Sequence, residues 1–362
     1  MPRVSRAASS LHRLDGRLGY RATRVIATAL GGLVLSAGAS LAAPAHQMPP
    51  IVAERIGTGV IAVPSPIAVP VPVPVKPRPT RSPEKRPATK AIRKRPVVRW
   101  LPSGTGMWLH EYAQTEGGNA RAIVARAQHI GLSALYVQTG SSKKGWIGTP
   151  ALRGLLAATQ RTNISIIAWD FPTLDDPVGD AHRLARAASF HCGGCARVAA
   201  VAPDVETAAE GTRIGDQAVA RYYAALRAAL PANIAILATV PWPSEKRVGR
   251  YPYARTAVLA DALMPMAYWY NRDPAHVTAT SMGFLSHFHK PIMPVGQGYD
   301  SRLDAPYLPP DLDPFGSVAA FLRTARDRGA QHVSLWSWQT TGGHQWSALA
   351  KARKAFPMQR RR

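Results

Sequence analysis

Residues 198–206 are VAAVAPDVE, a short apolar run that ends in two carboxyl-bearing side chains, Asp204 and Glu206. A run of this length, bounded by polar residues, is typical of a strand that is buried on both faces of a parallel sheet. Seven similar runs recur through residues 106–339: GMWLHEY (106–112), ALYVQT (134–139), SIIAWDF (165–171), AILATVP (235–241), ALMPMAYWY (262–270), IMPVGQGY (292–299) and HVSLWSWQ (332–339).

Helical patterns lie between these runs, for example at residues 119–130, 216–230 and 316–329. One strand with its crossover helix needs about 30 residues, and a complete eightfold barrel takes about 250 residues. The number and the spacing of the runs therefore predict an α/β fold, a (β/α)8 TIM barrel, over residues 104–358.

The part of the chain before this barrel has a different composition, because residues 1–100 hold 17 of the 45 Lys and Arg but only 3 of the 21 Asp and Glu. Six arginines between Arg3 and Arg24 precede an uncharged stretch, Val25 to Ala45, that ends in the small residues SLAAPA. This pattern predicts an export signal over residues 1–45, cleaved after Ala45. The same stretch is also just long enough to stay as a signal anchor. Both interpretations place the barrel outside the cytoplasm, either secreted or anchored to the membrane.

Residues 46–103 are rich in proline and basic side chains, with VPVPVPVKPRP at 69–79 and RSPEKRPATKAIRKRP at 81–96. Alternating Val and Pro favours an extended polyproline II chain of about 3.1 Å per residue. We therefore expect a disordered spacer long enough to cross a cell wall. Its charges suit either a solvated linker or attraction to an anionic wall polymer or membrane surface. We expect no nucleic-acid partner in an exported chain, and residues 359–362 form a basic tail.

The chain has two cysteines, Cys192 and Cys195, in the sequence CGGC just before the fourth predicted strand. Two cysteines alone cannot supply a tetrahedral metal site, and the segment lacks the βαβ setting of a thioredoxin-like redox motif. Export favours oxidation. We predict a local structural disulfide.

Active sites of (β/α)8 barrels lie at the C-terminal ends of the strands. Side chains alternate between the faces of a strand, so Asp204 and Glu206 should face the same side, as should Trp336 and Trp338. Two close carboxyl groups in a partly desolvated pocket cannot both ionise easily, so one keeps its proton. A protonated acid beside a carboxylate is the chemistry of glycoside cleavage, which makes Glu206 the candidate general acid. The alternatives are a solvated strand end or a pair with a cation such as Arg213.

Three strand ends resemble those of family 18 glycoside hydrolases, the chitinase-like barrels. Residues 204–206 (DVE) match the end of that family's acidic signature, residues 266–268 (MAY) resemble its M-x-Y segment, and residues 336–338 (WSW) its terminal W-S-W. The resemblance covers roughly residues 104–356 in architecture. It implies that Glu206 is the general acid and that Asp204 and Tyr268 hold an acetamido group of the substrate. It also implies that Trp336 forms the floor of the sugar subsite.

The chain also departs from the family pattern. Ala199 and Ala202 stand where the D-x-x-D-x-D-x-E signature has acids, and Trp269 stands where M-x-Y-D ends in aspartate. A lesser resemblance links the chain to family 25 lysozyme-like barrels, which carry a D-x-E at a strand end. Those barrels begin with an aspartate where this chain has His110 and Glu111.

A mechanism with two carboxyl groups would need a partner for Glu206, and Asp170 and Glu111 are the acids at other strand ends. A separation of about 5 Å would favour retention, and about 6.5 Å or more inversion. Asp170 could instead be a turn residue before Pro172, and Glu111 a member of an ion pair at the rim.

Side chains suited to sugar binding also lie at the strand ends or in the loops that follow: Trp336, Trp338, Gln297, Gln138, Glu111 and Trp146. Aromatic rings stack on sugars, but a barrel also needs large side chains to fill its lumen. Trp146 lies among polar and small residues in SSKKGWIG (141–148), so we expect it to be the exposed platform. Lys143 and Lys144 in that loop would favour an acidic glycan.

We expect neither a metal site nor a cofactor, because His287, His289 and His344 form no ligand pattern and no phosphate-binding glycine loop is present. The sequence carries no signal for the oligomeric state. These features predict an exported or wall-tethered glycoside hydrolase that cleaves a polysaccharide, an N-acetylated wall glycan or a chitin-like chain. A non-catalytic glycan-binding barrel of the cell envelope is the alternative, and a mainly structural envelope protein is a third interpretation.

Overall fold

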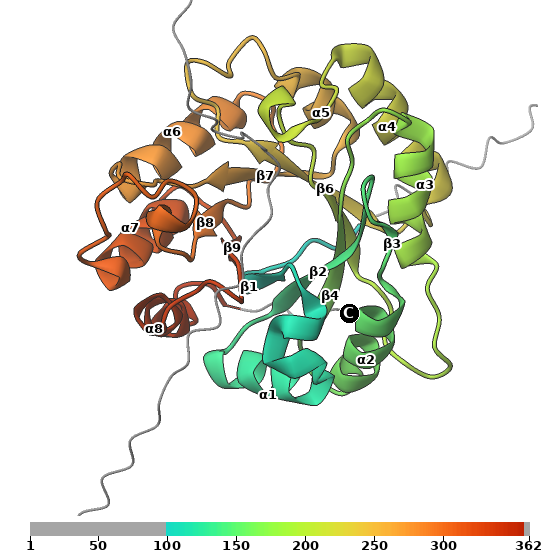
Figure 1. The fold of residues 1–362 in the computed structure, drawn as a ribbon, viewed down its shortest axis with the longest axis horizontal. Coiled ribbons are helices and arrows are strands. Elements are labelled where there is room, and N and C mark those ends of the chain that lie inside the picture. Colours follow the sequence, from blue (N-terminus) through green and yellow to red (C-terminus); the bar gives the residue numbers. More distant parts are fainter. Residues whose placement is uncertain (1–98, 358–362) are drawn as a thin grey trace, which may run out of the picture. The chain divides into compact units, whose positions relative to one another are not determined.

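The structure, a computed structural model, describes residues 99–357. Eight parallel strands form a closed barrel, since the sheet order β1-β9-β8-β7-β6-β5-β4-β2 is completed by pairing of β1 with β2 (Figure 1). The predicted (β/α)8 barrel is therefore confirmed. The predicted signal segment (1–45), nearly all of the spacer (46–103) and the basic tail (359–362) lie outside the described residues. The barrel strands are β1 (Gly104–Leu109), β2 (Ala134–Ser141), β4 (Ser165–Phe171), β5 (Ala200–Pro203), β6 (Ala235–Pro241), β7 (Ala262–Ala267), β8 (Val295–Gln297) and β9 (His332–Trp336).

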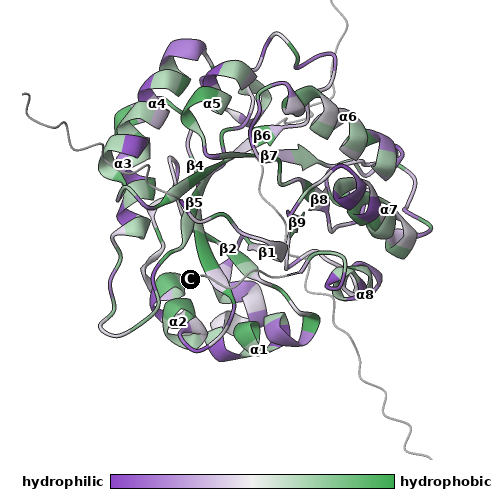
Figure 2. Ribbon diagram, turned by 180° about the vertical axis from the view of Figure 1, so that it is seen from behind, coloured by the Kyte–Doolittle hydropathy of each residue, from purple (hydrophilic) through white to green (hydrophobic). Residues whose placement is uncertain are grey.

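The helices surround the barrel, as Figures 1 and 2 show from opposite sides. They are α1 (Ala120–Ile130), α2 (Thr149–Thr159), α3 (Pro177–Ala188), α4 (Asp216–Ala229), α5 (Tyr253–Leu259), α6 (Pro274–Ser286), α7 (Pro314–Asp327) and α8 (Gly343–Ala352). The short strand β3 (Gly145–Trp146) pairs antiparallel with the end of β2. Within residues 99–357, no helix is both long enough and apolar enough to cross a membrane.

Three helices begin with the same local signal, an aspartate followed by proline. Asp176, Asp273 and Asp313 each precede the first residue of α3, α6 and α7 and accept hydrogen bonds from backbone amides of the first turn. The carboxylate satisfies amide groups that have no partner within the helix, and the fixed φ of proline suits the first helical position. The first residue of each of these helices thus marks the end of the loop that follows the preceding strand.

Side chains pack in two layers, one between helices and strands and one inside the lumen. The lumen is filled by large residues, of which Trp108 and Tyr136 stack with their ring centroids 4.5 Å apart. Trp108 Nε1 donates to Ser334 Oγ at 2.9 Å, and the Tyr136 hydroxyl lies 2.8 Å from His332 Nε2. The lower barrel is thus closed, and Trp108 forms the floor of the space above it.

A disulfide joins Cys192 and Cys195 in the loop between α3 and β5, with Cα atoms 5.7 Å apart. The loop is held to α2 by a backbone hydrogen bond from Ala196 to Leu156. The disulfide therefore closes a small loop ahead of the strand that leads to Asp204 and Glu206.

Candidate catalytic pocket

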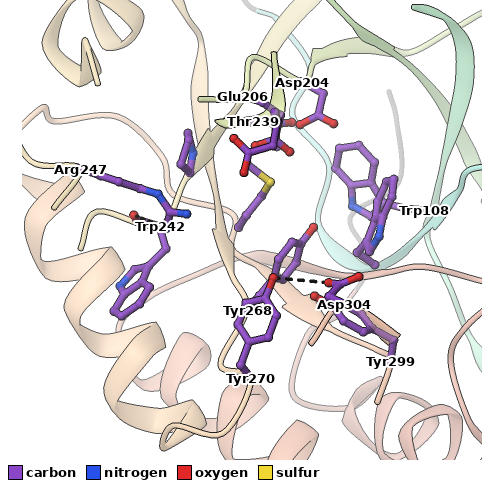
Figure 3. A pocket seen from close by; sticks show the side chains of 14 residues that line it. Trp108, Asp204, Glu206, Thr239, Trp242, Arg247, Tyr268, Tyr270, Tyr299 and Asp304 are labelled. Carbon is purple, nitrogen blue, oxygen red and sulfur yellow. Dashed lines mark hydrogen bonds between the residues drawn. The ribbon is translucent and has the colours of Figure 1, made fainter. Parts of the chain in front are cut away.

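A cavity of about 360 Å³ opens at the C-terminal ends of the strands, above Trp108 (Figure 3). Its walls come from β1, β6, β7 and β9 and from the loops after β5, β6, β7 and β8. The 14 residues that line it are Trp108, Asp204, Glu206, Glu210, Thr239, Pro241, Trp242, Arg247, Met266, Tyr268, Tyr270, Tyr299, Asp304 and Trp336. Carboxyl and aromatic side chains dominate this lining.

Asp204 and Glu206 both line the pocket, so the structure brings together the pair that the sequence singles out (Figure 3). Strand β5 ends at Pro203, and Asp204 continues it through a bridge to Thr239 and a 2.9 Å hydrogen bond from its amide to the carbonyl of Asp170. The Asp204 side chain is buried, at 6% exposure, and its Oδ1 has no hydrogen-bond partner among residues 99–357. Glu206, two residues further along the chain, is half-buried.

The electrostatics of the pair favour protonated forms. Burial, reinforced by the charges of Asp170 and Glu210, raises the pKa of Asp204 to about 7. Burial, together with the charges of Asp204 and Glu210, raises the pKa of Glu206 well above its ordinary value, and the positive charge of Arg247 opposes the rise. Both shifts favour the protonated forms, so Glu206 is suited to donate a proton, while Asp204 exchanges its proton near pH 7.

Aromatic side chains form the remaining walls. Trp336 at the end of β9 is half-buried, and its ring lies 5.8 Å from that of Trp108 and 5.4 Å from that of Trp169. Tyr268 follows β7 and packs edge-on against Tyr299, with ring centroids 5.9 Å apart. Burial raises the pKa of Tyr268 well above its usual value, so its hydroxyl stays a hydrogen-bond donor. In Figure 3, Tyr268 and Tyr299 face the two acids across the cavity.

Asp170 does not line the pocket, contrary to the role expected of it as a second carboxyl group. Its carboxylate, fully buried, is held by Arg183 of α3 through two hydrogen bonds of 2.8 and 2.6 Å. Arg183 also binds Asp180 at 2.7 Å. Burial raises the pKa of Asp170, and the bonds from Arg183 oppose this. Asp170 thus fixes α3 against β4 and presents its backbone carbonyl to Asp204.

Glu111 also lies outside the pocket lining. Its carboxylate forms an ion pair of 2.9 Å with Lys144, and both side chains are partly exposed. Of the two lysines in the SSKKGWIG loop, Lys144 is therefore engaged by an acid at the rim. Neither of the two acids proposed from sequence as partners of Glu206 reaches the cavity.

Trp338 was expected beside Trp336, and the structure places it elsewhere. Strand β9 ends at Trp336, so the alternation of side chains does not continue to Trp338. The buried Trp338 ring packs instead on Trp346 of α8, at 5.0 Å, and its Nε1 donates to Glu116. Trp338 is part of the layer between helices and strands.

Trp146 is not the exposed platform that its neighbours in sequence predict. Its ring is half-buried, Arg186 lies over it at 4.6 Å, and its Nε1 donates to Thr149 Oγ1. Pairing of β3 with β2 folds this segment onto the protein. Trp146 does not line the cavity.

The two glutamines predicted to bind sugar, Gln297 and Gln138, are buried and do not line the cavity. Gln297 accepts a hydrogen bond from the amide of Tyr270 at 2.7 Å and donates to Tyr299 O and Ser301 Oγ, so it holds together the loops that carry the pocket tyrosines. Gln138 lies on β2, and its Oε1 has no partner among the described residues.

Several lining residues were not predicted as site residues, among them Glu210, Arg247, Asp304 and Trp108. The first three lie in loops after β5, β6 and β8, where no periodic pattern marks a direction, and Trp108 sits inside a strand. The long intervals between the predicted strand ends and the next helices, such as residues 242–252 and 298–313, were the available signal. Long loops at this face of a barrel commonly carry function.

No group of three His, Cys, Asp or Glu side chains that could hold a metal ion occurs within residues 99–357. The acids of the pocket are instead interleaved with tyrosines, Arg247 and Trp242. The arrangement can donate a proton, stabilise a developing positive charge and stack flat rings.

No protein-family model matches this chain, and no curated protein matches it. Solved structures do resemble it. They include the spore cortex-lytic enzyme SleL of Bacillus cereus (TM-score 0.50, 13% identity, covering 69% of this chain and 74% of that one). Others are active domain 2 of a chitinase from Pyrococcus furiosus, complexed with chito-oligosaccharides (0.51, 12%, 72% and 97%), and an endo-1,4-beta-mannanase from Rhizomucor miehei (0.51, 8%, 70% and 95%). At these identities the likeness shows the fold, the (β/α)8 barrel on which these glycan-cleaving proteins are built.

Proposed function

We propose that this protein is a glycoside hydrolase that cleaves an N-acetylated polysaccharide, with Glu206 as the general acid. The observation that carries the proposal is the Asp204–Glu206 pair at the end of β5, in a pocket walled by aromatic rings. The raised pKa of Glu206 favours its protonated form, which is the form that a general acid needs. The fold likeness to chitinases and a cortex-lytic enzyme supports this class, while the likeness to a mannanase shows that the fold alone does not select the sugar.

The proposed first step breaks the bond between C1 of the sugar and the glycosidic oxygen. Glu206 donates its proton to that oxygen, which leaves as an alcohol with the bonding electron pair. The acetamido oxygen of the same sugar attacks C1, while Asp204 accepts a hydrogen bond from the acetamido N–H. Tyr268 donates a hydrogen bond to the acetamido group from the facing wall. In the second step, a water oxygen attacks C1 and the bond between C1 and the acetamido oxygen breaks, which restores the acetamido group. Glu206 takes a proton from that water and regains its acid form.

Asp204 suits this role because it lines the pocket and its buried Oδ1 has no partner among the described residues. A buried polar atom without a partner costs free energy, and a bound acetamido group would satisfy it. Asp170 and Glu111, which would be needed in a two-carboxylate mechanism, are engaged with Arg183 and Lys144. Glu210 and Asp304 are the other carboxyl groups in the pocket that would serve such a mechanism instead.

The second candidate function is non-catalytic binding of a glycan. It is favoured by Ala199 and Ala202, which are buried where family 18 enzymes have acids, and by Trp269, which packs on Phe321 in the outer layer. Ala202 lies on the lumen face directly below Asp204, so an apolar methyl group stands where a second carboxylate would tune the pair. A pocket of this kind would still stack sugars on Trp336.

We also propose that residues 1–45 export the chain and that residues 46–103 act as a spacer between the envelope and the barrel. The arginines before an uncharged stretch, and the Val-Pro repeat after it, support this arrangement. The basic residues of the spacer would hold the barrel near anionic wall polymers or lipid headgroups.

The release of reducing ends from chitin oligosaccharides, a bacterial cell-wall glycan and mannan tests the function. We expect cleavage of the N-acetylated chains only, with loss of turnover in Glu206→Gln and in Asp204→Asn. Glu111→Gln, whose carboxylate lies outside the pocket, serves as the matched control and should keep full activity. Binding of the oligosaccharides without cleavage by the parent would support the non-catalytic alternative.

A further inference from the structure

The loop after β6, residues 242–252, carries a cation into the pocket. Arg247 is half-buried and lines the cavity together with the two acids. In Figure 3 its guanidinium points inward from the wall opposite Trp108. A sugar bound over Trp108 and Trp336 would therefore meet Arg247 at its far edge.

Arg247 has no acidic partner within the described part of the chain. Its guanidinium makes one long hydrogen bond, 3.5 Å, to the carbonyl of Trp242. By comparison, Arg183 has two carboxylate partners and Arg227 is paired with Asp261. Arg247 and Glu206 line the same cavity, and the charge of Arg247 opposes the rise of the Glu206 pKa.

The loop is fixed relative to the acids by hydrogen bonds at its C-terminal end. The Tyr251 hydroxyl donates to the carbonyl of Val205, the residue between Asp204 and Glu206, at 2.9 Å. The amide of Arg247 donates to Ser244 O at 2.8 Å, and the Tyr253 hydroxyl donates to Pro241 O at 3.0 Å. The backbone that carries Arg247 is thus held in place, which lowers the cost of ordering the loop when a ligand binds.

We propose that Arg247 binds a carboxylate substituent of the sugar, so that the substrate is an acidic N-acetylated glycan. A guanidinium presents paired N–H donors that match the two oxygens of a carboxylate. Four carboxyl groups, those of Asp204, Glu206, Glu210 and Asp304, line the same pocket. A singly charged carboxylate is repelled by these groups less than a doubly charged phosphate is. The inference rests on the proposed function, since it names the substrate class of the same pocket.

The test compares three oligosaccharides of equal length by calorimetric titration into full-length Glu206→Gln protein. The first alternates N-acetylglucosamine with its 3-O-lactyl ether, which carries one carboxylate per disaccharide. The second is the same chain with those carboxylates converted to primary amides, and the third carries phosphate monoesters in their place. We expect the carboxylate form to bind about 10-fold or more tightly than the amide form, as a charge-assisted hydrogen bond allows.

Adding Arg247→Gln should remove this preference, and Arg247→Lys should restore part of it. Arg250→Gln is the matched control, because Arg250 lies exposed in the same loop outside the pocket lining, and it should leave the preference unchanged. Equal binding of acid and amide forms, a preference that survives Arg247→Gln, or tighter binding of the phosphate form would overturn the assignment.

The failure of this inference can be distinguished from failure of the proposed function. Cleavage of neutral chitin oligosaccharides by the parent, with no preference for the acid form, would overturn the role of Arg247 and leave the hydrolase intact. An Arg247-dependent preference in a parent that cleaves none of the chains would overturn the hydrolase and retain the binding role.

Discussion

Asp204 is a carboxyl group that the fold buries at the mouth of the barrel with one oxygen unpaired. The methyl group of Ala202 lies below it, and the neighbouring charges of Asp170 and Glu210 are of the same sign. All of these disfavour the ionised form. A group kept in this state costs stability, which is a common property of residues selected for chemistry rather than for folding.

Asp204 should therefore make the protein less stable as the pH rises. The folded protein keeps the Asp204 proton up to about pH 7, whereas an unfolded chain releases it near pH 3.9. The folded state thus binds more protons between these values, so stability falls from about pH 4 to about pH 7. In Asp204→Asn, the decline in Tm over this range should be smaller than in the parent by roughly 2 °C or more.

Thermal unfolding at several pH values measures this difference, with Asp304→Asn as the control because Asp304 is exposed. An Asp204→Asn variant whose Tm declines with pH as steeply as that of the parent would show that Asp204 ionises at its ordinary pKa.

Sequence reasoning located the residues whose position follows from a strand, and missed those whose position follows from a loop. Asp204, Glu206, Tyr268 and Trp336 follow apolar runs, so the geometry of the barrel directs them to one face. Asp170 follows such a run as well, but its environment depends on Arg183, 13 residues further along the chain. No local pattern shows that partnership.

At the scale of elements, β2 and β9 build the floor of the pocket through Tyr136 and His332. Tyr136 stacks below Trp108, and its hydroxyl meets His332 Nε2 at 2.8 Å in a fully buried contact. Burial lowers the pKa of His332 to about 4. The contact thus depends on a neutral imidazole, and it supports the ring on which the proposed substrate would lie.

His332 should make the protein sensitive to acid. The folded state keeps the imidazole neutral down to about pH 4, whereas the unfolded chain takes up a proton near pH 6.5. The unfolded state thus binds more protons, so stability falls as the pH drops from about 6.5 to about 4. In His332→Gln, which keeps a polar group facing Tyr136 but cannot titrate, the loss of stability between pH 7 and pH 4.5 should be smaller.

Urea unfolding at the two pH values checks this, with His182→Gln on α3 as the control. The variant is expected to be less stable than the parent at pH 7 because packing changes, so the comparison concerns the difference between pH values. An equal loss in both proteins would mean that His332 is not the titrating group.

The strands were predicted well because each of them is a dense apolar run. The prediction for Trp338 was wrong because alternation was extended past Trp336, where β9 ends. Strand ends depend on pairing with both neighbours, which a single sequence does not show. The prediction for Trp146 was wrong because the two-residue strand β3 is too short to leave a pattern.

At the scale of the whole molecule, the predicted boundary at residue 104 can be compared with the packing around it. Arg99 forms an ion pair with Asp261 at 3.2 Å, Leu101 packs against the side chains of the lumen, and Ser103 O accepts a hydrogen bond from Ser133. The five residues before β1 therefore contact the barrel and contribute to closing its lower end.

A chain that begins at Arg99 should melt at the temperature of the full-length protein, because residues 46–98 have no periodic apolar pattern from which a core could form. A chain that begins at Gly104 should be less stable by about 1–2 kcal/mol, the value of partly burying a side chain such as Leu101. Differential scanning calorimetry of the full-length protein, the chain from Arg99 and the chain from Gly104 measures these differences in stability. A Tm for the Arg99 chain many degrees below that of the full-length protein would show that the spacer packs on the barrel.

The architecture of the barrel could be predicted because eight repeats of one pattern over about 250 residues admit few folds. Export, cleavage and tethering remain predictions, since residues 1–98 lie outside the described part of the chain. The substrate could not be predicted because it depends on loop residues such as Arg247 and Asp304, whose placement is a property of the assembled barrel.

The central claim is that Glu206 protonates the glycosidic oxygen. The most direct measurement compares kcat/KM of the parent and of Glu206→Gln on two substrates of the same sugar. One is a chitin oligosaccharide, whose leaving alcohol needs a proton, and the other an aryl glycoside with a strongly acidic phenol, which leaves without one. General acid catalysis contributes about 10²–10⁴-fold, so the account predicts a loss of that order on the oligosaccharide and a far smaller loss on the aryl glycoside. An equal loss on both substrates, or no loss on the oligosaccharide, would contradict it.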